Sequence, residues 1–317
     1  MRRTWPVVPA VFLLFTAPWL FFSPDDLFIH LRFAQNLTTL GEWSFNPGYP
    51  VAGATSPPWV LSLAVLRSLG VGPVLSAKGL GLVTGLLTLG AVTWALAEAR
   101  APNKYVVLIA AAVGVSHWLT LWTASGMETP LPVLLLTLAV ALTLREKRNP
   151  WIIGAVLGLA TLARPDAIPA SIVLLVGALV VMGWLDGLKA LGTFVVVAIS
   201  WPLVSWFWLG TWLPITVGAK SGSQVIASAL PKVFLRTGMV AVLEMLPLAL
   251  LFASAFFLDK EIRHRWKLWL FPLVAAASYP LGYLVNNLQG GSRHQVDTWC
   301  PGTYCWRSLA ASPWCHG

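Results

Sequence analysis

Two adjacent carboxylates, Asp25 and Asp26, follow an apolar stretch in the segment Phe21–Leu37, FFSPDDLFIHLRFAQNL. Adjacent like charges repel each other, and charges at a membrane boundary lose hydration, so this pair needs compensation. One interpretation is structural. Ser23 would be an N-cap, Pro24 the first helical residue, and both acids would complement the helix dipole in the first turn.

A polar ridge beyond the pair points to chemistry as well. At 100° per residue, Asp25, Arg32 and Asn36 share one helix face, and His30 comes one turn after Asp26. A carboxylate can take a proton from an attacking hydroxyl, while nearby cations hold an anionic leaving group. The segment therefore carries the residue types that group transfer requires.

Other charged candidates stand where apolar segments end, and each has a structural alternative. Glu128 precedes Thr129-Pro130 and could cap a helix, whereas Arg164 and Asp166 could pair locally across the turn at Pro165. Lys220 could be a solvated loop lysine. If the Arg164 turn lies below the membrane surface, it has to line a cavity or be buried in protein.

The elements that must position these residues are membrane helices. The chain has 317 residues, of which 57% are hydrophobic and only 10% charged, far from the balance of a soluble domain. We expect an all-α polytopic protein, because many apolar runs approach the ~20 residues that cross a bilayer. The nine predicted spans are 5–22, 74–97, 105–124, 130–144, 151–163, 167–184, 190–209, 238–258 and 268–288.

Charge placement predicts the orientation of these spans. With the N-terminus inside, short inner loops such as 98–104 and 145–150 hold more than half of the 21 Lys and Arg. The net charge of +9 therefore reflects membrane topology and disfavours a nucleic-acid partner. The first span lacks a small-residue cleavage site, so we expect it to be retained. Residues 23–73 form a long outer loop, in which Ser56–Gly70 is too short to span and is expected to lie on the surface.

The acidic pair is followed by the short motifs RFAQN, FNPG and TSPPW, and then by SGMET, ARPDA and GTWLPITVGAK. In this order, the motifs resemble the GT-C superfamily of membrane glycosyltransferases, and its arabinofuranosyltransferase-like and aminoarabinose-transferase-like branch in particular. The matching segments are Asp25–Asp26, Arg32–Asn36, Phe45–Gly48, Thr55–Trp59, Ser125–Thr129, Ala163–Ala167 and Gly210–Lys220. The resemblance covers about residues 1–290. One position departs from it, since Ile215 stands where the family usually has Asn.

The resemblance implies a GT-C-type helical bundle in the plasma (inner) membrane, with an active site that faces outside or the periplasm. It implies an inverting glycosyltransferase that moves a sugar from a polyprenyl-phosphate donor to a glycan, lipid or protein acceptor of the cell envelope. Asp25 would be the base, and Asp26 would orient the substrate or help bind a metal. No cofactor is required, although a divalent metal ion could take part.

The same resemblance assigns the remaining candidates. Arg32, Lys220 and Arg164 would bind the donor, and His30, Glu128 and Asp166 would line the site or contact the acceptor. Two other functions stay open: a transporter or flippase of lipid-linked sugars, and a non-catalytic GT-C remnant. A transporter would place its acids in the middle of its spans.

The C-terminal segment 289–317 differs in composition from everything before it. All three cysteines of the chain, Cys300, Cys305 and Cys315, lie there without apolar periodicity, and their spacing fits no zinc framework. We expect a truncated or frameshifted end to the membrane module 1–288, with a disulfide hairpin between Cys300 and Cys305 as the alternative.

Overall fold

The computed structural model describes residues 7–212, and these form helices joined by short turns and by one longer loop at residues 41–56. No β-strand occurs in this part of the chain, only an isolated bridge between Ser44 and Pro50. The elements are α1 (Val7–Thr16), η1 (Ala17–Phe21), α2 (Asp25–Leu40), α3 (Pro57–Ser68), α4 (Pro73–Glu98), α5 (Asn103–Gly114), α6 (His117–Ser125), α7 (Pro130–Leu144), α8 (Pro150–Ala163), η2 (Pro165–Ala167), α9 (Ile168–Met182) and α10 (Trp184–Leu209).

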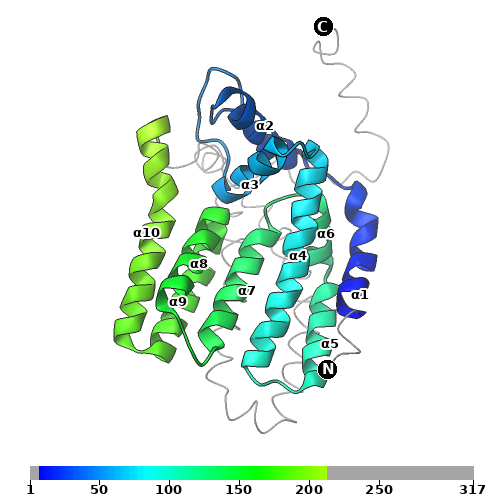
Figure 1. The fold of residues 1–317 in the computed structure, drawn as a ribbon, viewed down its shortest axis with the longest axis vertical. Coiled ribbons are helices and arrows are strands. Elements are labelled where there is room, and N and C mark those ends of the chain that lie inside the picture. Colours follow the sequence, from blue (N-terminus) through cyan, green and yellow to red (C-terminus); the bar gives the residue numbers. More distant parts are fainter. Residues whose placement is uncertain (1–6, 213–317) are drawn as a thin grey trace, which may run out of the picture.

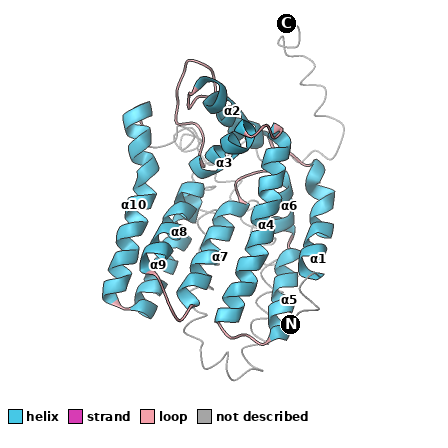
Figure 2. Ribbon diagram, viewed as in Figure 1, coloured by secondary structure: helices cyan, strands magenta, loops and turns pink. Residues whose placement is uncertain are grey.

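The helices form a bundle with a small layer across one end. Helices α1 and α4 to α10 run roughly along the long axis, whereas α2 and α3 lie across the top of the bundle in Figure 1 and Figure 2. The chain turns by 87° between the helical segment Val7–Phe21 and α2. We call α2, α3 and the loop between them the end layer.

The helices match the predicted spans closely within the described residues. Three helices are long and apolar enough to cross a membrane, or up to five if each bent pair counts as one span. One bent pair corresponds to the predicted span 105–124, which breaks into α5 and α6 at an angle of 54°. Helices α7 and α8 are apolar but shorter than 18 residues. The predicted spans 238–258 and 268–288 lie outside the described residues, and so does the tail 289–317.

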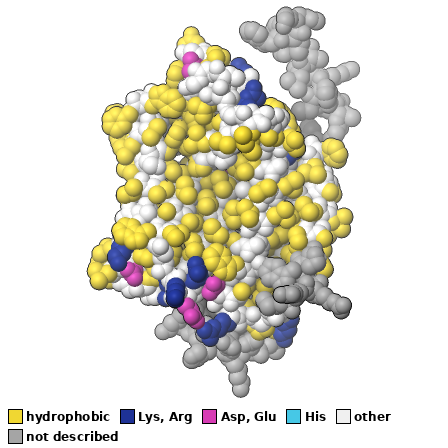
Figure 3. Space-filling view, in the orientation of Figure 1, with side chains coloured by type: hydrophobic (Ala, Val, Ile, Leu, Met, Phe, Trp, Pro, Cys, Tyr) yellow, Lys and Arg dark blue, Asp and Glu magenta, His cyan; other side chains and the backbone are white. Residues whose placement is uncertain are grey.

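The turns divide between the two ends of the bundle. The turn at 126–129 and the turn at Arg164 lie at the same end as the end layer, and the loops 99–102 and 145–149 lie at the other end (Figure 1). Charged side chains are visible near both ends in Figure 3, and the band between them is apolar. This pattern is the one expected of a protein that sits in a lipid bilayer.

Close contacts between small residues set the helix spacing. A Cβ at Gly154 or Gly158 of α8 would collide with α10, at the Ala190 carbonyl and at Val197 respectively. Helix α4 approaches α6 in the same way, because a Cβ at Gly85 would come within 2.7 Å of Thr123. Small residues four positions apart let two helix backbones approach closely in a membrane, where dispersion contacts replace hydrophobic driving force.

An apolar core joins the end layer to the bundle. Trp43 and Trp59 are fully buried, and they pack with Leu27 and Phe33 of α2. Trp201 of α10 lies against Trp43, with ring centroids 4.4 Å apart. The orientation of α2 is therefore fixed by large buried side chains rather than by its short connections alone.

Candidate active site at the end layer

The acidic pair occupies the first turn of α2. The helix begins at Asp25 with Pro24 as N-cap, and no side chain caps it. The expectation that Ser23 is the N-cap was therefore wrong by one residue. Pro24 has the extended ψ of 157° that N-cap residues usually adopt, and its carbonyl already accepts a hydrogen bond from the Leu27 N–H.

Both acids are exposed, and within residues 7–212 neither Asp25 nor Asp26 has an ion-pair partner. Their position in the first turn is electrostatically favourable because free N–H groups gather there. The dipole interpretation thus accounts for why the pair is tolerated, and it leaves both carboxylates accessible to a ligand.

The other members of the polar ridge hold a loop. Arg32 Nε donates to the Phe45 carbonyl at 3.2 Å, and Asn36 Nδ2 donates to the carbonyls of Ser44 and Phe45 at 2.9 and 3.0 Å. Glu42 closes the same loop by accepting from the Gly48 N–H at 2.8 Å. No contact joins Arg32 to Asp25 in the described structure. Asp25 and Arg32 are thus both on α2, as expected, but they do not contact each other.

The buried face of α2 carries His30 into contact with Glu128. Nε2 of His30 lies 3.1 Å from Glu128 Oε2, and the two side chains are only 4% and 3% exposed. The two groups are close enough for an ion pair. The other ring nitrogen, His30 Nδ1, is buried and has no hydrogen-bond partner among the described residues. Glu128 does not cap α7, which begins without a side-chain cap.

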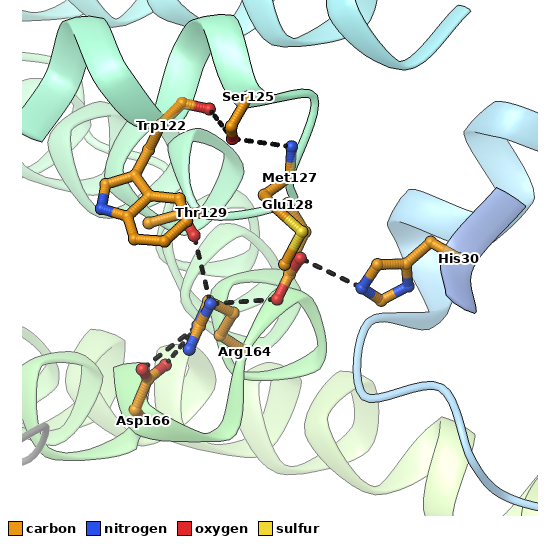
Figure 4. A network of polar contacts seen from close by, with 8 residues as sticks. All are labelled: His30, Trp122, Ser125, Met127, Glu128, Thr129, Arg164 and Asp166. Carbon is orange, nitrogen blue, oxygen red and sulfur yellow. Dashed lines mark hydrogen bonds and ion pairs between the residues drawn. The ribbon is translucent and has the colours of Figure 1, made fainter. Parts of the chain in front are cut away.

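Arg164 connects this pair to a second turn of the bundle, as Figure 4 shows. Its Nη1 donates to Glu128 Oε1 at 3.0 Å and to the Thr129 hydroxyl at 3.1 Å. Its Nε lies 3.1 Å from both carboxylate oxygens of Asp166. The local Arg164–Asp166 pair considered from the sequence is thus present, and Arg164 bridges two buried acids while 25% of its side chain stays exposed.

The surroundings keep Glu128 ionised. Burial alone would raise the pKa of this carboxyl, but the Arg164 guanidinium and the His30 imidazole outweigh burial and lower the pKa from 4.5 to about 2. A buried carboxylate with such partners holds its neighbours in fixed positions. It is poorly suited to accept a proton near neutral pH, so any general base has to be sought elsewhere.

Four of the eight predicted site residues therefore form one network, made of His30, Glu128, Arg164 and Asp166. Asp25 and Asp26 lie on the same helix as His30 but in its exposed first turn, and Arg32 binds the loop. Lys220 lies outside the described residues. Sequence reasoning missed Thr129, which accepts a bond from Arg164. It also gave no role to Lys78, although a lysine inside an apolar helix is a functional suspect by default.

No group of three or more His, Cys, Asp or Glu side chains in residues 7–212 is arranged to hold a metal ion. Comparison with known proteins found no matching family model, no matching curated protein and no matching solved structure.

Proposed function

We propose that the chain is a membrane glycosyltransferase that uses a polyprenyl-phosphate sugar as donor. One observation carries the proposal. The three segments that resemble the GT-C family within residues 7–212 and bear charge, at 25–36, 125–129 and 163–167, are far apart in sequence and meet at the end layer. Their convergence supports a shared site there, because it brings buried charged side chains from distant segments into direct contact with one another.

The residues divide into two groups with different tasks. The exposed acids are accessible to an acceptor, and Asp25 takes the proton of the acceptor hydroxyl. The hydroxyl oxygen then attacks the anomeric carbon, the bond from that carbon to the phosphate oxygen breaks, and the lipid phosphate leaves with the electron pair. Attack from the opposite face inverts the anomeric centre. The buried network holds α2 in place, and the exposed part of Arg164 faces the donor phosphate.

The finer assignments belong to the same proposal. The bundle is a GT-C-type arrangement of nine spans, with spans 238–258 and 268–288 completing the helices described above. The protein lies in the plasma membrane with the end layer outside, where the polyprenyl donor meets a glycan, lipid or protein acceptor of the cell envelope. Lys220 and Arg32 contribute to binding the donor, and Arg32 has to exchange the Phe45 carbonyl for phosphate when it does so.

The positions of the acids favour a transferase over a transporter. Every Asp and Glu in residues 7–212 lies at the end of an α-helix, in a loop or in the short element η2, and none lies in the middle of an α-helix. A path across the membrane for charged or polar cargo needs polar groups at intermediate depth. The described acids instead lie at the two ends of the bundle.

The proposal is tested by assaying purified protein in lipid nanodiscs with a panel of polyprenyl-phosphate pentoses and hexoses. The expected result is release of polyprenyl phosphate and transfer of sugar by the parent protein, and loss of both in Asp25→Asn. Full activity of a folded Asp25→Asn protein rejects the assigned base. The absence of transfer and of donor hydrolysis across the panel rejects the proposed function.

A further inference from the structure

Lys78 is a basic residue inside an apolar helix. It lies in the second turn of α4, about 8 Å along the axis from the first residue of that helix. A lysine at this depth loses hydration, so its ammonium has to find partners within the protein. The side chain is partly buried, and its partners identify what it does.

The ammonium binds the ends of two different helices. Nζ donates to the Phe22 carbonyl at 2.8 Å and to the Ala124 carbonyl at 3.0 Å. Phe22 is the C-cap of η1, and Ala124 lies in the last turn of α6. Both helix ends present carbonyls without helical partners and carry partial negative charge, so one cation satisfies both.

Each of these two carbonyls shortly precedes one part of the candidate site, namely the acidic pair and the Glu128 network. Phe22 lies three residues before Asp25, and Ala124 lies four residues before Glu128. The intervening Gly126 has φ +80°, and a Cβ built on it would lie 3.1 Å from the Ala77 side chain and 3.2 Å from the Leu27 side chain. The turn is therefore pressed between α4 and α2, with little freedom to move.

We infer that Lys78 is a positioning residue that fixes the exposed acidic pair relative to the buried Glu128 network. A single side chain on α4 ties the chain entering α2 to the chain entering the Glu128 turn. The inference rests on and deepens the proposed function, since transfer depends on the position of the acidic pair relative to the Glu128 network. It also makes a structural claim that holds whether or not the protein is a transferase.

The structural claim is tested by a distance measurement on the full chain. Spin labels are placed on cysteines at Phe28 of α2 and Ile168 of α9, which are both exposed, after the three native cysteines are changed to serine. Lys78→Met keeps the length and the apolar stem but removes the donors. The expected result is a broader distance distribution than in the parent. Lys104→Met, a change at the exposed start of α5, leaves it unchanged.

Lys78→Arg is the conservative variant, because a guanidinium can donate to both carbonyls. It is expected to keep the narrow distribution even where Lys78→Met fails to fold. A well-folded Lys78→Met protein with the parent distribution overturns the inference, and so does Lys78→Arg with a broadened one.

Transfer assays on the same proteins separate this inference from the proposed function. Misplacing a catalytic group by about 1 Å can cost on the order of 10²-fold, so Lys78→Met should lower kcat by at least about tenfold and Lys78→Arg should restore it. Broadening by Lys78→Met without transfer in the parent rejects the proposed function and keeps the inference. Loss of transfer without broadening rejects the inference alone.

Discussion

The two ends of the bundle contain similar charged residues in opposite environments. At the end away from the end layer, Arg100 and Glu146 pair at 2.9 Å with side chains 56% and 84% exposed, and Lys189 pairs with Asp186 in the same exposed way. At the end layer, Glu128 and Asp166 are almost fully buried around Arg164.

Exposed and buried charges require different explanations. Exposed ion pairs are screened by water and contribute about 0–1 kcal/mol to stability, so their loss has little effect on folding. Buried charges lose several kcal/mol of hydration each, and they persist only where partners compensate them. Membrane topology therefore accounts for the exposed ion pairs at the end away from the end layer. The buried charges at the end layer need a functional or architectural reason.

The largest expected effect is on transfer at the end layer. Asp25→Asn keeps the shape of the side chain but cannot take a proton, so transfer should fall by roughly 10²–10⁴-fold with an unchanged melting temperature. Asp26→Asn should cost less, unless the two acids share a metal ion, in which case the loss depends on the divalent cation supplied. Asp186→Asn is the matched control, since it removes an exposed acid from the opposite end. Equal losses in Asp25→Asn and Asp186→Asn would remove the distinction between the ends.

A second effect concerns stability. Glu128→Gln removes the buried carboxylate that accepts from Arg164 Nη1 and should lower the free energy of unfolding by roughly 1–3 kcal/mol. The paired control is Glu146→Gln, which breaks an exposed ion pair and should change stability by less than about 1 kcal/mol. Unfolding in mixed micelles of increasing denaturing detergent measures both. An unchanged midpoint for Glu128→Gln would mean that the buried network contributes nothing to stability.

The ionisation of Glu128 should also make the stability of the protein depend on pH in the acid range. The pKa of Glu128 is lower in the folded protein, about 2, than its ordinary value of 4.5. Its contribution is therefore fully present above about pH 4.5 and is lost as the pH falls toward 2. The difference corresponds to on the order of 3 kcal/mol at most. Melting curves between pH 6 and pH 3 should show a steeper loss for the parent than for Glu128→Gln. Parallel curves would contradict the assigned ionisation.

The smallest expected effect on the protein comes from single-cysteine substitutions that test which side of the membrane each end faces. Cysteines at Phe28 and at Lys147 replace exposed side chains at opposite ends, and neither should alter folding or activity. In intact cells with the native cysteines removed, an impermeant maleimide should label the first and not the second. The reverse pattern would invert the proposed orientation and place the acidic pair inside.

Helix positions could be predicted from the sequence because apolar runs and their breaks are local signals. The run 130–144 matches α7, and the surface helix expected at 56–70 is α3. The helix start was misplaced by one residue, because Ser23 and Pro24 both suit the start of a helix and only the backbone shows which of them is the N-cap.

The members of the buried network were visible in the sequence, but their contacts were not. The charged residues at His30, Glu128 and Arg164 stand out in an apolar chain, but their contacts depend on how the end layer folds over two distant turns. The role of Arg32 was missed for the same reason, since its partner is a backbone carbonyl in a loop that returns to α2. Lys78 was visible in the sequence, yet nothing local indicates that it joins two helix ends.

The glycine contacts between α8 and α10 also offer a way to recognise diverged relatives. Because Gly154 and Gly158 meet the α10 backbone and Val197 with no room for a side chain, any homologue with the same helix spacing has to keep very small residues at both positions. Substitution elsewhere on α8 is far less restricted, since Trp151 and Ile152 are exposed. Sequences gathered in future should thus align on this pair even where every charged residue has changed.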